Sequence, residues 1–266
     1  MREAQRPRWT RIVPALGHSG SGGRPLLDGV VISVAPGVIG RWVLRMLRRA
    51  AAAGMDVRPL AAGVAAQRID PLALFAAAVS QDTPRLDALA RAQGDDHGVL
   101  RALAPLIARP MLQACRRAWA GRVPETWAYG HCPICGSWPA LAEIRGLGGS
   151  RHLRCGACGS DWRTPWLRCS FCGQDDHERL ASLASAESVS REAIAVCDGC
   201  TRYLKTITTL APIRPEHVML QDLGTQVLDV VALERGYRRP AAPARRMAVG
   251  VVAPPSRWRD LLGLRP

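Results

Sequence analysis

The sequence predicts an α+β protein with an N-terminal helical domain, two tandem four-cysteine metal modules of the ribbon type and a C-terminal helix. Three features indicate this order. Alanine and leucine recur at helical spacing up to about residue 120. Eight of the nine cysteines then fall in four Cys-x-x-Cys pairs between residues 132 and 200. Helical spacing returns after Pro215.

Length and composition exclude a membrane-spanning protein. The chain has 266 residues, of which 48% are hydrophobic, enough for one or two domains with their own cores. No run approaches the ~20 apolar residues that cross a bilayer. The first 20 residues are basic but lack the apolar segment of a signal peptide. We therefore expect a cytoplasmic protein that contacts no membrane.

The positive charge is concentrated at the two ends. The formal net charge is +14. Residues 1–24 and 241–266 each carry five arginines and one acidic residue, hence +4 each. Both ends are rich in Pro, Gly or Ala, which predicts a flexible lead over residues 1–25 and a disordered Pro/Arg-rich tail over residues 240–266. The charge is therefore weak support for nucleic-acid binding.

Residues 26–125 form the predicted helical domain. Apolar residues recur at helical spacing from Val38 to Ala53. Asp70–Pro71 and Thr83–Pro84 each have the pattern of an N-cap followed by a proline in the first turn. The helices predicted to follow them cover residues 72–79 and 85–93.

A further helix is predicted over residues 99–120. Pro105 and Pro110 are expected to break or kink it, because each removes a backbone donor and clashes with the preceding turn. Cys115 shares an apolar face of this helix. We expect it to be a buried core thiol and no metal ligand.

Residues 126–210 form the predicted metal region. Glycine, aromatic residues and the cysteine pairs replace the Ala/Leu pattern, and short alternating runs indicate a small antiparallel sheet. The predicted strands cover residues 138–144, 161–167, 193–196 and 203–210. Residues 211–239 follow, with a helix that ends at Gly236.

The cysteine spacing is typical of metal-binding turns. A Cys-x-x-Cys turn brings two thiolates to one ion, and two turns complete a tetrahedral shell. Structural disulfides would need an oxidising compartment, and thioredoxin-like motifs occur singly at the start of a helix. The predicted metal ligands are Cys132, Cys135, Cys155, Cys158, Cys169, Cys172, Cys197 and Cys200.

The four pairs could share two ions in three ways. Gaps of 19 and 24 residues separate the members of the first two and the last two pairs, which suits a hairpin between two turns. The gap of ten residues between the second and third pairs suits a linking strand. We therefore favour sequential sharing, and a cross-braced arrangement stays open.

No catalytic constellation is visible in the sequence. His131, His152 and His177 lie near the pairs, but eight thiolates complete both shells without them. There are no paired carboxylates at acid–base spacing, no phosphate-binding loop and no Ser/His/Asp arrangement. We expect a protein that is not an enzyme.

Four ordered segments resemble a known family. They are HCPICGSWPALAEI, RHLRCGACGSDWRTPWLRCSFCG, CDGCTRYLKT and LGTQVLDVVALERGYRR. They include all four cysteine pairs and lie within residues 128–239. In these segments the chain resembles the FdhE family, the formate dehydrogenase accessory (formation) proteins of bacteria.

The resemblance implies a role, a partner and a metal. It implies a cytoplasmic chaperone-like protein that binds the catalytic subunit of a molybdenum- or tungsten-dependent formate dehydrogenase and assists its maturation. It also implies rubredoxin-like sites with iron, two ions per chain. Four thiolates accept iron and zinc about equally well, so zinc stays open in either site. Homodimerisation also stays open.

Two other functions are compatible with the pattern. Tandem rubredoxin-like sites could carry electrons, although such carriers are small and lack a large helical domain. Four arginines interleaved with two tryptophans could instead form a nucleic-acid surface. These residues are Arg151, Arg154, Trp162, Arg163, Trp166 and Arg168. The alternative for the tryptophans is the core of the ribbons.

Overall fold

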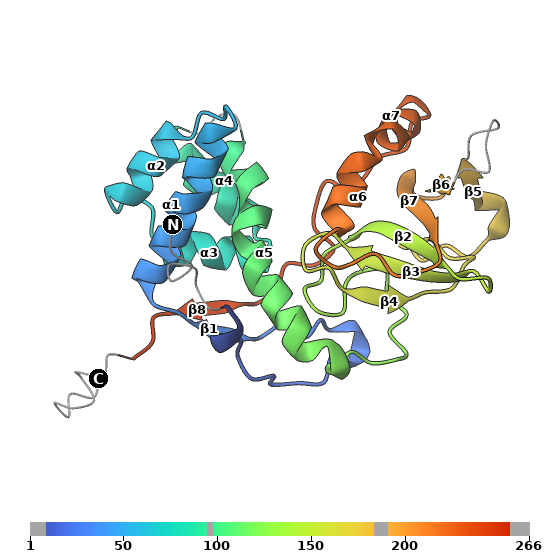
Figure 1. Cartoon of the computed structure of the whole chain (residues 1–266), viewed down its shortest axis with the longest axis horizontal. Helices are drawn as coiled ribbons and strands as arrows, with labels where there is room; N and C mark the ends of the chain where they lie inside the picture. Colours follow the sequence, from blue (N-terminus) through green and yellow to red (C-terminus); the bar gives the residue numbers. More distant parts are fainter. Residues whose placement is uncertain (1–8, 95–97, 184–190, 256–266) are drawn as a thin grey trace. The chain divides into compact units, whose positions relative to one another are not determined.

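Figure 1 shows the fold as a computed structural model, which describes residues 9–94, 98–183 and 191–255. The chain divides into two compact units. The first, here the helical unit, is built mainly from residues 29–114. The second, here the sheet unit, is built from residues 18–28 and 115–246. The predicted α+β class and order of elements are confirmed.

Where the structure describes it, the helical unit contains four helices and most of a fifth, longer one. They are α1 (Pro36–Ala52), α2 (Arg58–Ala65), α3 (Pro71–Ser80), α4 (Thr83–Arg91) and α5 (Val99–Trp119). α1 buries Ile39, Val43 and Leu47, the face that its periodicity predicts. α2 was not predicted, because its eight residues are too few to establish a period. Within the described residues, no helix has the length and apolar character to cross a membrane.

Capping side chains start α3 and α4. Asp70 accepts hydrogen bonds from the N–H groups of Leu72 and Ala73 at 3.0 and 3.3 Å, as predicted. The prediction of Thr83 as the second cap was wrong by one residue. Asp82 caps α4, and its carboxylate accepts the Arg85 N–H at 3.3 Å.

The expectation that proline breaks the fifth helix was also wrong. α5 continues through Pro105 and Pro110. A proline inside a helix costs about 3 kcal/mol. Burial of Ile107, Met111 and Leu112 along the same helix offsets this cost, since each buried aliphatic side chain contributes ~1.5–3 kcal/mol.

Parts of both ends are ordered, contrary to the predicted lead and tail. Trp9 stacks on Phe75 with ring centroids 5.7 Å apart. Strand β8 (Gly250–Val252) pairs in parallel with β1 (Val31–Ser33). Composition misled the prediction because a short apolar run within a Pro/Arg-rich segment is enough to complete a strand pair. The remainder of the predicted lead and tail, residues 1–8 and 256–266, lies outside the described residues.

Truncation after Pro240 is expected to destabilise the helical unit. It removes β8 and the buried Met247, whose N–H donates to the Ser80 carbonyl at 3.0 Å. Loss of one buried Met side chain and a strand pair is worth about 2–4 kcal/mol, so the melting temperature should fall by ~4–16 °C. Thermal unfolding followed by circular dichroism checks this. A truncation after Pro255, which keeps β8, is the control, and equal melting temperatures for the two would contradict the prediction.

The described residues of the sheet unit form a mixed sheet of six strands in the order β4-β3-β2-β7-β6-β5. The strands are β2 (Pro139–Arg145), β3 (Ser150–Cys155), β4 (Asp161–Arg163), β5 (Leu180–Leu183), β6 (Glu192–Cys197) and β7 (Arg202–Thr209). Each cysteine ribbon contributes three antiparallel strands. Parallel pairing of β2 with β7 joins the two sets, with Leu141 opposite Lys205. The predicted antiparallel sheet was therefore wrong in this one pairing.

In this six-stranded sheet, the prediction missed β3 and β5 and made β4 too long. β3 has the sequence SRHLRC, which lacks an apolar alternation because arginines occupy two of its buried positions. β5 has only four residues. β4 ends at Arg163 because Pro165 follows closely and cannot donate to a sheet.

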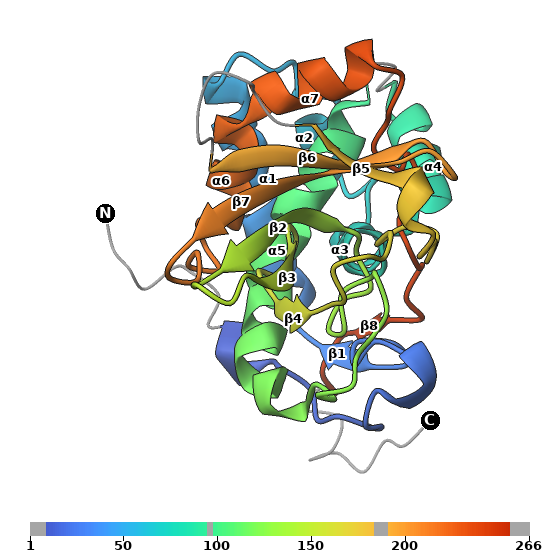
Figure 2. The same cartoon turned by 90° about the vertical axis from the view of Figure 1, so that its right-hand side faces the viewer.

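Two helices lie over one face of this sheet (Figure 2). They are α6 (Val218–Gly224) and α7 (Gln226–Glu234). The predicted C-terminal helix is thus interrupted at Thr225, whose hydroxyl donates to the Gln221 carbonyl at 2.9 Å. α7 packs its Ala232 against Ile194, Val196 and Tyr203 of the sheet.

A buried lysine anchors these helices to β7. Lys205, the chain's one lysine, is fully buried and lies 2.8 Å from Asp222 and 2.9 Å from Asp229. Arg239 pairs with the same two carboxylates at 2.5 and 2.9 Å. The Tyr203 hydroxyl donates to Asp229 at 2.7 Å. Burial alone would raise the pKa of Asp229, but the hydrogen bonds from Tyr203 and Lys205 lower it.

Candidate metal centres

The eight paired cysteines come together as two groups of four, each of which could hold one ion. Cluster 1 contains Cys132, Cys135, Cys155 and Cys158. Cluster 2 contains Cys169, Cys172, Cys197 and Cys200. The grouping is sequential, as favoured from the gap lengths. In each cluster a hairpin carries the chain from one turn to the next, β2–β3 in the first and β5–β6 in the second.

Local hydrogen bonds give the turns a common shape. The Cys132 carbonyl accepts the Gly136 N–H at 2.9 Å, and the Cys132 N–H donates to the Ser137 carbonyl at 2.9 Å. The same two bonds recur in the turns that start at Cys155 and Cys169. In these three turns the fifth residue is a glycine at positive φ, such as Gly136 at 67°. The fourth turn has Thr201 there, at φ 53°.

The sulfur geometry of cluster 1 fits a tetrahedral ion. The Sγ atoms of Cys132 and Cys158 are 3.5 Å apart, as are those of Cys135 and Cys155. Four thiolates at the usual metal–sulfur bond length of ~2.3 Å lie about 3.8 Å from one another. All four cysteines are fully buried. These two distances are within a few tenths of an ångström of the tetrahedral value, and all four sulfurs lie within 4.8 Å of one another.

Nearby donors also suit thiolates in cluster 1. The Ile134 N–H donates to Cys132 Sγ, and the Cys158 N–H to Cys155 Sγ, both at 3.4 Å. The hydroxyls of Ser137 and Ser160 lie 3.3 and 3.2 Å from Cys135 and Cys158 Sγ. Burial, with the neighbouring sulfurs, raises the pKa of Cys132 well above its ordinary value. A raised pKa keeps the thiol protonated, and a bound cation would displace the thiol proton.

Cluster 2 has similar sulfur distances but is open to solvent. Cys169 and Cys200 Sγ are 3.7 Å apart, and Cys172 and Cys197 Sγ are 3.8 Å apart. Cys172 is exposed and Cys200 is half-buried. The turns of this cluster have Gln174 and Arg202 where those of cluster 1 have serines, so they lack the hydroxyls beside the sulfurs.

Chelator should therefore remove metal from the two clusters at different rates. Excess chelator on the two-metal protein is expected to release one ion fast and the second at least about tenfold more slowly, because attack on a buried shell needs local opening. A colorimetric chelator assay measures both phases. Cys172→Ala with Cys200→Ala should abolish the fast phase and leave the slow one. Release of both ions at one rate would contradict this assignment.

The remaining cysteine and the histidines lie outside both clusters. Cys115 is fully buried, and burial raises its pKa to about 12, as expected of a core thiol. His131 Nε2 hydrogen bonds to the Gly23 carbonyl at 3.0 Å. His152 Nδ1 lies 2.8 Å from Asp161. His177 starts a short 3-10 turn before β5.

A network of buried charged side chains lies on β2 and β3, the strand that ends at Cys155 of cluster 1. The sequence analysis did not predict this network. Glu143 on β2 is fully buried and pairs with Arg154 and Arg145. Its carboxylate also accepts the Ile213 N–H at 3.2 Å. Arg145 continues the network to Asp161. The one sequence signal was a charged residue at an inward position of each of two adjacent strands.

A second buried arginine holds the linker between the clusters. Arg151 on β3 donates to the carbonyls of Pro165 and Arg168 at 3.1 and 3.0 Å, and to the Ser170 hydroxyl at 3.1 Å. Because the linker leads directly into Cys169, Arg151 fixes where cluster 2 begins relative to the sheet.

This arrangement removes much of the predicted nucleic-acid surface. Arg151, Arg154 and Trp162 are buried. The Trp162 indole N–H donates to the Tyr129 carbonyl at 3.0 Å, so this ring belongs to the core. Trp166 is exposed, which leaves a single ring instead of a stacking platform.

Comparison with known proteins gives distant relatives of one kind. Protein FdhE of Escherichia coli O127:H6 is 32% identical over 111 residues, covering 41% of this chain and 35% of that protein. FdhE homologs of Aquifex aeolicus and Pseudomonas aeruginosa are 32% and 33% identical over 119 and 125 residues, each covering 40% of the relative. No family model matches the chain.

The fold extends the similarity along the chain. The crystal structure of the FdhE protein from Pseudomonas aeruginosa superposes with a TM-score of 0.54, covering 93% of this chain and 86% of that one at 22% identity. The chain is a distant homologue of the FdhE proteins. The aligned sequence of this homologue spans only 35–40% of the curated relatives, so the similarity in sequence is partial and that in fold is broad.

Proposed function

We propose that the chain is an accessory protein for a molybdenum- or tungsten-dependent formate dehydrogenase. It binds the catalytic subunit in the cytoplasm and holds it during maturation, and it catalyses no reaction itself. The homology to FdhE proteins supports the link to formate dehydrogenase. The two clusters support a metal-stabilised scaffold, because eight of the nine cysteines are used to form them.

One observation carries the binding role: an exposed apolar ridge on α6 and α7. Five large apolar side chains there are each more than half exposed. We define the ridge by Leu220, Leu223, Val227, Val230 and Leu233. Their spacing of three and four residues is that of a helix face built for contact. Exposed apolar surface of this kind is typical of protein-binding sites.

The ridge is held on a rigid base. Lys205 and Arg239 clamp both helices to β7 through Asp222 and Asp229. The sheet beneath joins both clusters through the β2–β7 pair. Loss of either metal would therefore disturb the surface that carries the ridge. On this proposal, partner binding depends on metal binding.

We propose iron as the native metal, two ions per chain in rubredoxin-like sites, with zinc able to occupy either shell. The four-thiolate shells do not distinguish iron from zinc, because both metals accept four thiolate ligands. Iron when bound would add a change of redox state, whereas zinc would act only as a structural crosslink. The exposed Cys172 places cluster 2 where such a redox change could be sensed.

Co-purification from the native host tests the proposal. Affinity-tagged wild-type protein should retain the formate dehydrogenase catalytic polypeptide. Val227→Glu with Val230→Glu should reduce its recovery at least about tenfold, since each charge is placed in an apolar contact. Gln226→Glu, exposed on the same helix, is the matched control and should bind normally. Recovery of no formate dehydrogenase subunit with wild-type protein, or of nucleic acid instead, would overturn the proposal.

A further inference from the structure

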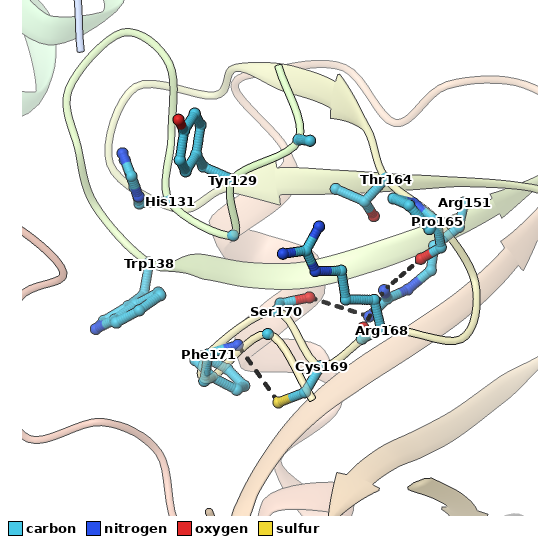
Figure 3. Close-up of a pocket in the computed structure, with 13 residues that line it drawn as sticks. Tyr129, His131, Trp138, Arg151, Thr164, Pro165, Arg168, Cys169, Ser170 and Phe171 are labelled. Carbon is cyan, nitrogen blue, oxygen red and sulfur yellow. Dashed lines mark hydrogen bonds between the residues drawn. The ribbon is translucent and has the colours of Figure 1, made fainter. Parts of the chain in front are cut away.

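A small pocket of the sheet unit lies between the first and third cysteine turns (Figure 3). Its volume is about 200 Å³. Three aromatic rings, Tyr129, Trp138 and Phe171, form part of its wall. Its lining includes two arginines, Arg151 and Arg168, and no carboxylate. The pocket therefore has a positive character, and it is separate from the metal-binding sulfurs except for Cys169 at its edge.

Two donors in this pocket have no acceptor among the described residues. Thr164 is buried to nine-tenths, and its hydroxyl has no hydrogen-bond partner. Figure 3 shows that hydroxyl turned toward the pocket, and the Arg168 guanidinium extended across it below Tyr129. No ion pair involving Arg168 occurs in the described part of the chain. Arg151, in contrast, is already engaged with the linker carbonyls.

The pocket is a fixed cavity. Gly130 at its rim packs so closely that a Cβ there would lie 1.6 Å from the Ser170 carbonyl oxygen. Trp138 and Phe171 meet edge to face with centroids 5.3 Å apart. A buried donor without a partner costs about 1–3 kcal/mol, and a fixed wall prevents Thr164 from turning away to find one. An acceptor brought by a ligand would remove this cost.

We propose that this pocket binds a carboxylate group. A guanidinium presents two parallel N–H donors that match the two carboxylate oxygens, and the Thr164 hydroxyl supplies a third donor. One free positive charge matches a monoanion better than a phosphate dianion. The volume corresponds to about six or seven water molecules, enough for the carboxylate and a few further atoms.

The carboxylate could come from a small acid or from the end of a polypeptide. In either case it would sit beside cluster 2, because Arg168 precedes Cys169. The guanidinium of Arg168 also lies close to the third turn: a Cβ placed on Gly173 would be 3.6 Å from Arg168 Nη2. The proposal does not depend on formate dehydrogenase as the partner.

Isothermal titration calorimetry on the full, metal-loaded chain tests this inference. The probes are sodium acetate, sodium phosphate, and trialanine with a free or an amidated C-terminus. Acetate should bind saturably, and Arg168→Gln should weaken binding about tenfold or more, the effect of losing a charge-assisted hydrogen bond. Thr164→Val should weaken it about threefold or more, since it removes only the hydroxyl. Arg163→Gln, an exposed neighbour outside the pocket, should bind as wild type.

The peptide arms identify the source of the carboxylate. Tighter binding of free trialanine than of acetate would assign a chain end, and equal binding would assign a small acid; both support the proposal. It is overturned if wild-type protein does not bind acetate, if phosphate binds more tightly, if amidated trialanine binds as well as the free peptide, or if Arg163→Gln weakens binding as much as Arg168→Gln. Unchanged binding by Thr164→Val in protein that retains two metal ions would also overturn it.

Discussion

Replacing Cys155 and Cys158 together with alanine will unfold the sheet unit and leave helices α1 to α4 formed. Structural zinc contributes ~10–16 kcal/mol to the folding of small zinc-finger peptides, which is as large as the whole stability of an ordinary domain. Cys155 and Cys158 belong to cluster 1, in the first ribbon. Because β2 of that ribbon pairs with β7 of the second, the loss should spread across the sheet.

Limited proteolysis with mass spectrometry measures this effect. Cleavage should become fast throughout residues 128–210 while fragments of residues 36–91 persist. Cys115→Ala is the control, because this buried thiol lies outside both clusters and its loss should leave the metal content unchanged. Native protease resistance of the double variant across residues 128–210 would show that cluster 1 is not needed for folding.

Removal of the buried Glu143 carboxylate will be the most damaging single change outside the cysteines. Glu143→Leu leaves the buried Arg154 without its carboxylate and leaves the Ile213 N–H without an acceptor. Breaking a buried ion pair from one side costs about 3–5 kcal/mol, because the remaining charge stays buried. The melting temperature of the metal-loaded protein should fall by ~6–20 °C.

Differential scanning calorimetry of protein with two bound metal ions checks this prediction. Glu178→Leu, at an exposed glutamate, is the control and should melt within ~1–2 °C of wild type, since surface substitutions of this kind change stability by only about 0.5 kcal/mol. If Glu143→Leu melted like the control, the carboxylate would not hold the sheet, and the Glu143–Arg154 pair would have to be regarded as dispensable.

The elements that the sequence predicted well are those with local signals. Asp70 followed by Pro71 predicted the start of α3, because a cap and a first-turn proline act within four residues. The gaps between the cysteine pairs predicted sequential sharing, because a short gap limits which turns can meet. Cys115 was predicted as a core thiol from its place on an apolar helix face.

What could not be predicted depends on contacts between distant residues. The parallel β2–β7 pair joins Leu141 to Lys205, and nothing near either residue signals the other. β3 escaped prediction because Arg151 and Arg154 are hydrophilic in sequence yet buried in the structure, where Arg151 donates to backbone carbonyls and Arg154 pairs with Glu143. The ordered strand β8 was missed because its partner β1 lies more than 200 residues earlier in the chain.

The sequence predicted a C-terminal helix, but it did not predict which of its apolar residues are exposed. Leu223, Val227 and Val230 have the spacing of a core-facing stripe, and the sequence gives no sign that the stripe is exposed. In the structure the sheet contacts a different face, through Leu228, Val231 and Ala232. The exposed face is the ridge to which we assign partner binding.

Native mass spectrometry of protein purified without oxygen tests directly whether the sheet unit folds around two metal ions, each held by four thiolates. The account predicts two ions per wild-type chain. One ion is expected after Cys172→Ala with Cys200→Ala, whereas Cys155→Ala with Cys158→Ala, which unfolds the sheet unit, should leave neither ion bound. The account also predicts no disulfide among the eight paired cysteines. A freshly isolated chain with no metal, or with Cys132 and Cys135 joined as a disulfide, would contradict it.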